Sequence, residues 1–140
     1  MPTHEPVQSY EKTVGVEAAD IDFMGHVNNT VYLRWAQEVA TAHWEVLASR
    51  EDQEAILWVV ARHEIDYKQP ALLGDDVILR TWLGVSRGLL FERHTEVLRA
   101  TDRQVLATAR TLWIPIDSQT KKPKRLSAEL RAMFSSNPDS

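Results

Sequence analysis

The chain contains no cysteine among its 140 residues. This absence excludes disulfides, thiolate metal ligands and cysteine nucleophiles together. Any nucleophile that the protein uses must therefore present an oxygen or a nitrogen atom.

An excess of basic residues is also missing. The formal net charge is -4 and the sequence pI is about 5.7, whereas a protein that binds nucleic acid needs a clustered basic surplus to contact the phosphates. We therefore expect no nucleic-acid partner, although local basic residues are still able to contact a small anionic ligand.

Long hydrophobic runs are absent as well. The longest unbroken run, Ala55 to Ala61, is far shorter than the roughly 20 apolar residues of a membrane-spanning helix. The first five residues lack the basic and apolar segments of a secretory leader. These features favour a cytoplasmic protein with no membrane association.

The apolar material that is present suffices for one core. With 44% hydrophobic residues, a chain of this length predicts a single domain over residues 1–140. Its two ends, residues 1–9 and 135–140, carry no hydrophobic pattern, so we expect them to fray.

Hydrophobic periodicity predicts one long helix and five strands. Between Thr30 and about Ala48, polar side chains recur every three or four residues, and apolar side chains fill the remaining wide arc. Elsewhere, alternation of apolar and polar residues predicts strands, and Ser49–Gln53 is typical of a polar connector. The expected strands are Tyr10–Ala18, Ile56–Lys68, Val77–Val85, Leu89–Arg99 and Val105–Ile116, and a short helix capped by Ser127 is expected to reach Phe134.

These elements indicate an α+β domain in which one antiparallel sheet of about five strands wraps the long helix. The apolar arc of the helix supports this interpretation, because a surface helix needs an apolar stripe of only roughly 100°. An open sheet has exposed edges, which proteins manage by pairing or covering them. We therefore expect a homodimer or homotetramer.

The most distinctive stretch, residues 19–32, lies at the start of the long helix. Asn28, Asn29 and Thr30 are all good N-cap residues, because their short side chains accept hydrogen bonds from the first backbone N–H groups of a helix. Those N–H groups and the positive end of the helix dipole can bind an anion or a developing oxyanion. Asp22 lies just before them, where a carboxylate can act as a base or nucleophile.

The segment Asp22-Phe23-Met24-Gly25-His26-Val27-Asn28-Asn29, followed by Tyr32, resembles the D-x-x-x-H-V-N-N-x-x-Y signature of hotdog-fold acyl thioesterases of the 4-hydroxybenzoyl-CoA thioesterase type. The order of the expected elements is similar to that family over most of the chain. The resemblance implies the hotdog fold and hydrolysis of an acyl-CoA or acyl-carrier-protein thioester, with no cofactor and no metal. Plant acyl-carrier-protein thioesterases are also similar here, but they carry asparagine where this chain has Met24, which leaves Asp22 as the better candidate for the catalytic group.

The resemblance also implies a role for each residue of the motif. Asp22 attacks the thioester carbon or activates a water, and the sequence leaves both routes open. The backbone amides of Gly25, His26 and Val27 would bind the oxyanion, with Gly25 at positive φ and the His26 ring able to polarise the carbonyl. The residues expected to contact the substrate are Asn28 and Asn29 at the helix cap, Tyr32 and Trp35 along an acyl slot, and Lys68 and Arg87 at the coenzyme A phosphates.

Two other functions remain open from the sequence. A hydratase or dehydratase on the same fold would use His26 as its base and would turn over an acyl thioester without releasing thiol. A non-catalytic acyl-binding module would bind acyl-CoA without thiol release, and an Asp22→Ala change would leave its behaviour untouched.

Several charged or titratable residues outside the motif are interpreted as structural or solvated. Asp20 is expected to be a solvated neighbour of Asp22, and Glu38 a solvated or hydrogen-bonded residue on the polar face of the helix. His63 points to the apolar face of its strand, which favours a satisfied core histidine. Arg93 and the loop Lys121–Arg125 are further candidates for phosphate contacts, but each is typical of solvated surface charge.

Two motifs imitate other functions. Gly84-Val85-Ser86-Arg87-Gly88 matches the G-x-S-x-G elbow of serine hydrolases, but that turn leads into a helix, whereas the next segment here alternates like a strand. Residues 20–25 imitate the start of a calcium loop, but Met24 and Val31 stand where oxygen ligands are needed. A transition-metal site at Asp22 and His26 lacks a third ligand.

Overall fold

The computed structural model of the protein describes residues 9–136. The elements in chain order are β1 (Tyr10–Gly15), the 3-10 helix η1 (Ala18–Asp20), α1 (Asn29–Leu47), α2 (Arg50–Ala55), β2 (Ile56–Tyr67), β3 (Asp76–Arg87), β4 (Leu90–Arg99), β5 (Val105–Asp117), α3 (Ala128–Arg131) and β6 (Ser135–Ser136). The prediction that the ends fray falls largely outside the described residues. Ser135 and Ser136, at the start of the predicted C-terminal end, form the short strand β6.

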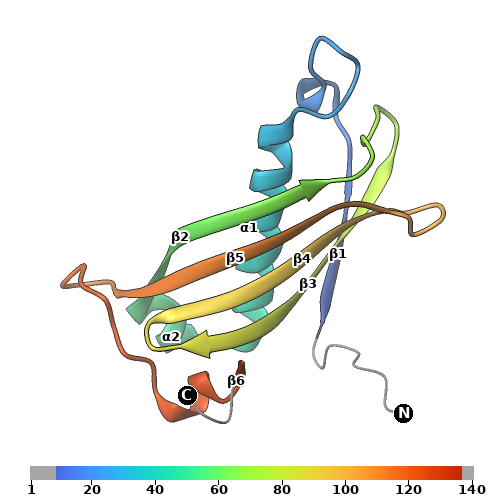
Figure 1. Cartoon of the computed structure of the whole chain (residues 1–140). Helices are drawn as coiled ribbons and strands as arrows, with labels where there is room; N and C mark the ends of the chain where they lie inside the picture. The colour runs from blue at the N-terminus through green and yellow to red at the C-terminus, as the bar shows by residue number, and fades with distance from the viewer. Residues whose placement is uncertain (1–8, 137–140) are drawn as a thin grey trace, which may run out of the picture.

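One sheet and one long helix form the framework, as the sequence predicts. The strands are ordered β1-β3-β4-β5-β2 with antiparallel pairing throughout, and the short β6 adds to β3 in parallel. Strands β3, β4 and β5 are joined by short turns as a meander, whereas β2 and β3 lie apart, so the chain crosses between them. Helix α1 lies against one face of the sheet (Figure 1).

Helix α1 begins and ends within one residue of the predicted bounds. The side chain of Asn28 accepts a hydrogen bond from the Thr30 N–H and caps the first turn. Seven side chains on the sheet-facing side are buried: Val31, Tyr32, Trp35, Ala36, Val39, Ala40 and His43. Among the described helices, none is long and apolar enough to cross a membrane.

Three local predictions are corrected by the structure. The expected polar connector is largely a helix, α2, because Ser49 Oγ accepts from Asp52 N (3.1 Å) and starts a turn that buries none of its residues. The first strand ends at Gly15 instead of Ala18, since Ala18 begins η1. The C-terminal helix α3 ends at Arg131, short of Phe134.

The core consists of two apolar clusters along α1. One cluster lies under the first half of the helix and contains Tyr32, Trp35 and Val39, and the other includes Phe91 and Phe134, with Trp44 packed against it. Buried polar side chains also lie beneath the helix: His43, Thr81, Arg93, Thr95 and Thr111. Arg93 was expected at the surface, and that prediction is wrong, because the residue is only 6% exposed.

Strand β2 forms a long edge of the sheet. Within the described residues it pairs with β5 alone, which leaves its other side without a neighbour. Two of its apolar side chains, Leu57 and Val59, are 43% and 46% exposed. A long edge strand with exposed apolar side chains favours association with another strand.

Candidate active site

The loop before α1 is a small closed structure. Its two ends meet in a β-bridge between Ile21 and Val27, and Asp22 N donates to His26 O (2.8 Å). Gly25 has a φ of +82°, a backbone conformation that residues other than glycine rarely adopt. The sequence prediction of positive φ is therefore confirmed. These contacts hold the loop as one unit at the start of the helix.

Asp22 is half-buried and held by one of its two carboxylate oxygens. Oδ1 accepts from the backbone N–H groups of Met24 (2.9 Å) and His26 (3.3 Å). Oδ2 makes no hydrogen bond with any residue that the structure describes. The carboxylate is therefore oriented by the loop and keeps one oxygen available for chemistry.

The three amides predicted to form the oxyanion hole already have acceptors. Gly25 N donates to Asp22 O (3.0 Å), His26 N to the Asp22 carboxylate, and Val27 N to Ala71 O (3.0 Å). Each would have to give up a protein contact to bind a substrate oxygen. This arrangement depends on how the loop folds, which the motif alone does not reveal.

The backbone N–H of Asn29 is the free donor at this end of α1. The neighbouring Asn28 N donates to Asp20 O (2.8 Å), and Thr30 N donates to Asn28 Oδ1 (2.9 Å). For Asn29 N there is no acceptor among residues 9–136, and it stands in the first turn, where the helix dipole favours negative charge. Asn28 is thus the cap, and Asn29 offers an amide rather than a capping side chain.

Asp20 is structural, but not in the way the sequence suggests. It is 3% exposed, so the prediction of a solvated residue is wrong. Its carboxylate accepts from Glu17 N (2.9 Å) and from Arg34 Nη2 (3.0 Å). Burial alone would raise the pKa of Asp20, but the Glu17 N–H and the Arg34 guanidinium hold that pKa below its ordinary value. The pair fastens the loop to the outer side of α1.

Tyr32 and Trp35 lie in the core rather than along an open slot. They are 4% and 2% exposed, because this face of α1 packs on the sheet. The Tyr32 hydroxyl accepts from Ala71 N (3.0 Å) and so ties the loop after β2 to the helix. Burial raises the pKa of Tyr32. Both residues support the site from beneath.

The predicted phosphate contacts lie at opposite ends of the sheet. Lys68 is exposed and follows β2 at the end nearest the start of α1, where the Tyr67 hydroxyl donates to Asn29 O (3.3 Å). Arg87 ends β3 at the far side of the sheet, beside the β3–β4 turn. The loop Lys121–Arg125 also lies at that far side, since Asp117 at the end of β5 pairs with Ile56 at the start of β2. One chain therefore brings Lys68, and not Arg87, to the Asp22 loop.

Apolar side chains surround the loop on the outside. Phe23 and Met24, at its tip, are 98% and 64% exposed. Leu72 and Leu73 belong to the neighbouring loop, which Val27 contacts through Ala71, and they are also exposed. So much exposed apolar surface beside a carboxylate is suited to binding an apolar partner or substrate.

The other motifs behave largely as the sequence indicates. Ser86 lies within β3, buried, and the chain continues into strand β4, so no elbow exists there. Glu38 forms an exposed ion pair with Arg34 (3.4 Å). The His63 ring contacts Thr111 Oγ1 through Nδ1 (2.9 Å), but its Nε2 has no partner in the described chain, so this core histidine is half satisfied. Residues 9–136 contain no cluster of three or more His, Asp or Glu suited to a metal.

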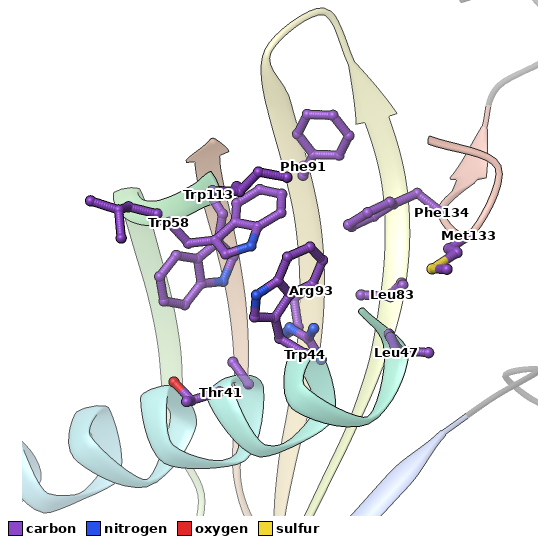
Figure 2. A pocket seen from close by; sticks show the side chains of 13 residues that line it. Thr41, Trp44, Leu47, Trp58, Leu83, Phe91, Arg93, Trp113, Met133 and Phe134 are labelled. Atoms are coloured by element: carbon purple, nitrogen blue, oxygen red, sulfur yellow. The ribbon is translucent and has the colours of Figure 1, made fainter. Parts of the chain in front are cut away.

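A second feature, a pocket of about 220 Å³ near the C-terminal half of α1, was not predicted. Figure 2 shows side chains from α1, four strands and the C-terminal segment converging on it. Its walls are largely aromatic. The one sequence feature related to this pocket is the content of five tryptophans in 140 residues. The aromatic lining residues are Trp44, Trp58, Phe91, Trp113 and Phe134.

The sequence as a whole matches known proteins. A family model described as the thioesterase-like superfamily matches residues 16–134. The long-chain acyl-CoA thioesterase FadM of Escherichia coli (strain K12) is 28% identical over 126 residues, which cover 84% of this chain and 91% of FadM.

Solved structures resemble the fold over nearly the whole chain. A thioesterase from Thermus thermophilus, solved with coenzyme A and Zn, has a TM-score of 0.75 and 25% identity, covering 88% of this chain and 94% of that one. A 1,4-dihydroxy-2-naphthoyl-CoA thioesterase from Synechocystis has a TM-score of 0.76 and 20% identity, covering 91% of this chain and 96% of that one. These likenesses confirm the predicted arrangement of one antiparallel sheet against one long helix.

Proposed function

The chain belongs to the thioesterase-like superfamily and is a thioester hydrolase, and we propose that it hydrolyses an acyl-CoA thioester with Asp22 as the reacting group. The observation that carries this proposal is the Asp22 carboxylate, which two backbone N–H groups fix through Oδ1 and whose Oδ2 has no partner among residues 9–136. The substrate class is supported by the names of the relatives, which include a long-chain acyl-CoA thioesterase and a structure bound to coenzyme A.

Two routes use the same carboxylate oxygen. In the first, Asp22 Oδ2 attacks the thioester carbon, the C–S bond breaks to release thiolate, and water then hydrolyses the mixed anhydride. In the second, Oδ2 removes a proton from a water that attacks the carbon directly. Both end in a free acid and a thiol, and a thiolate is a good leaving group that needs no strong acid.

The oxyanion donor in this proposal is the Asn29 amide. Its N–H is free, belongs to the first turn of α1, and gains most when negative charge develops on the substrate oxygen. The Tyr67 hydroxyl donates to Asn29 O, in the next peptide group, and helps to fix the first turn of α1. This choice replaces Gly25, His26 and Val27, whose amides are engaged elsewhere, although the half-exposed His26 ring remains able to polarise the carbonyl.

The surroundings of the loop suit the two ends of the substrate. Exposed Phe23, Met24 and Leu73 offer apolar surface to an acyl group. Lys68 offers a cation to the coenzyme A phosphates from the same end of the sheet. Because Phe23, Met24 and Leu73 are exposed beside Asp22, we propose that a second copy covers them and completes the acyl site.

A homodimer through β2 supplies that second copy. Pairing of two β2 edges about a two-fold axis is antiparallel, which brings the start of one β2 beside the end of the other. The far side of the second sheet, with its Arg87 and its Lys121–Arg125 loop, would then approach the Asp22 loop. This arrangement would bring Arg87 and the Lys121–Arg125 loop of one copy to the same site as Lys68 of the other.

The test is a thiol-release assay with the wild-type protein over short, long and aromatic acyl-CoAs. We expect thiol release with at least one class, in step with the appearance of free acid. Turnover of an enoyl- or hydroxyacyl-CoA without thiol would indicate the hydratase alternative. Binding of acyl-CoA without any turnover would indicate an acyl-binding module, and either result would contradict the proposal.

A further inference from the structure

The aromatic pocket contains a buried cation with no anionic partner in the described chain. Arg93 reaches from β4 toward α1 and lines this pocket (Figure 2). Its Nη1 donates to His43 Nδ1 (2.8 Å) and to Thr81 Oγ1 (3.1 Å). Its Nε and Nη2 groups donate to no acceptor within residues 9–136, and the pocket lining contains no aspartate or glutamate.

The two groups that contact Arg93 do not neutralise it. Burial lowers the pKa of Arg93 to about 10, so the guanidinium stays charged at neutral pH. Burial, together with the nearby Arg93, lowers the pKa of His43 to about 4, so the imidazole is neutral and accepts through Nδ1. A desolvated charge without a counter-ion is costly, and an anion that enters the pocket would remove that cost.

The remaining polar groups of the pocket also include unsatisfied donors. The indole Nε1 of Trp113 is buried with no acceptor in the described part of the chain, and the Thr41 hydroxyl lies at the pocket wall. Polar groups that lack acceptors suit a ligand that brings acceptor oxygens. Aromatic walls suit a ligand with an apolar body, and a few polar groups among apolar walls are typical of small-molecule sites.

We propose that this pocket is a binding site for an apolar organic carboxylate. The carboxylate pairs with the free Nε and Nη2 edge of Arg93, a geometry that guanidinium groups favour, and the hydrocarbon part packs against Trp44 and Trp58. The first pocket residue on α1, Ala40, lies eleven residues after Asn29, which is about 16 Å along the helix. The site therefore does not share the Asp22 loop of its own chain, and the proposal does not depend on hydrolysis.

The test is calorimetric titration with two matched probes, 4-phenylbutanoate and its neutral amide, 4-phenylbutanamide. We expect the wild type to bind the carboxylate about tenfold more tightly than the amide, or better, because a charge-assisted hydrogen bond is stronger than a neutral one. Binding should also change the tryptophan fluorescence, since three tryptophans line the pocket. Equal affinity for the two probes, or none for either, overturns the proposal.

Three variants locate the effect. Arg93→Met should remove the preference for the carboxylate and leave amide binding within about twofold, because methionine keeps the apolar stem and replacement of a buried charge by an apolar side chain is often tolerated. Arg110→Met is the matched control, since Arg110 is a half-exposed strand arginine paired with Glu92 away from the pocket. It should keep the wild-type preference. Thr41→Trp changes an exposed residue at the pocket wall and should weaken both probes.

Two results would contradict the proposal. A carboxylate preference that survives Arg93→Met, or probe binding unchanged by Thr41→Trp, excludes this pocket as the site. Should Arg93→Met fail to fold, the wild-type comparison and Thr41→Trp still decide. The comparison of the two probes on the wild type requires no turnover, so a failure of the hydrolase proposal leaves this result unaffected.

Discussion

The carboxylates of Asp20 and Asp22 have different hydrogen bonds, and these give the two residues different roles. Asp20 is buried, accepts from Glu17 N and Arg34, and so has both oxygens engaged. Asp22 has one oxygen engaged, and its other oxygen accepts no hydrogen bond from the part of the chain that the structure describes. The first arrangement holds the loop, and the second leaves an oxygen for a substrate. Their positions in the sequence differ by two residues, and only the hydrogen bonds separate their roles.

His43 gives a prediction at the same scale. Its pKa in the folded protein is about 4 against an ordinary value of 6.5, so the folded state stays neutral while the unfolded chain takes up a proton. The free energy of unfolding should therefore fall as pH drops from 6.5 to 4, by up to about 3 kcal/mol from this residue. Urea unfolding of wild type and His43→Gln across that range measures the effect. Parallel curves for the two proteins would contradict it.

Among the secondary-structure elements, helix α1 connects the parts of the candidate site. Its first turn offers the Asn29 amide, its outer side holds Asp20 through Arg34, and its inner side packs on the sheet. The cap at Asn28 sets where this helix begins. A change in the cap should therefore affect both the stability of the helix and the position of the free amide.

Asn28→Ala should lower the free energy of unfolding by about 1 kcal/mol, because the Thr30 N–H and hydroxyl both lose their acceptor. The matched control is Asn29→Ala, whose side chain caps nothing in the described chain. We expect that control to change stability by less than about 0.5 kcal/mol. Chemical denaturation measures both, and equal losses would show that Asn28 is not the cap.

The elements that the sequence predicted are those with a strong period. Helix α1 and strands β2 to β5 follow from apolar patterns that extend over nine or more positions. Helix α2 was missed because its six residues bury nothing and so carry no period. The early end of β1 was missed because Ala18 begins η1, a turn that the buried Asp20 carboxylate stabilises by accepting from Glu17 N.

Across the whole molecule, the sequence reveals the Asp22 motif but not the distant residues that contact it. The Asp22 segment and the cap lie within one stretch of sequence. The acceptor of the Val27 amide, Ala71 O, lies on another loop, and so the motif alone does not reveal that this amide is engaged. The pocket around Arg93 joins α1, four strands and the C-terminal segment, and no single stretch of sequence displays it.

The β2 edge gives the prediction for assembly. We expect the wild type to sediment as a dimer, with about twice the 16.0 kDa mass of the chain. Val59→Lys should shift it toward the monomer, because lysine on an edge strand opposes strand pairing. Val46→Lys makes the same substitution at an exposed valine on α1 and should leave the dimer intact. A monomeric wild type, or a dimer that survives Val59→Lys, would contradict pairing through β2.

The rate of thiol release by Asp22→Asn tests most directly whether Asp22 is the reacting group. Asparagine keeps an oxygen that accepts from Met24 and His26, so the loop should fold unchanged while the reacting carboxylate is lost. We expect kcat to fall by roughly a hundredfold to ten-thousandfold, whereas Asp102→Asn, which changes an exposed carboxylate in the β4–β5 turn, keeps wild-type turnover. Near-normal turnover by a folded Asp22→Asn protein would show that Asp22 is not the reacting group.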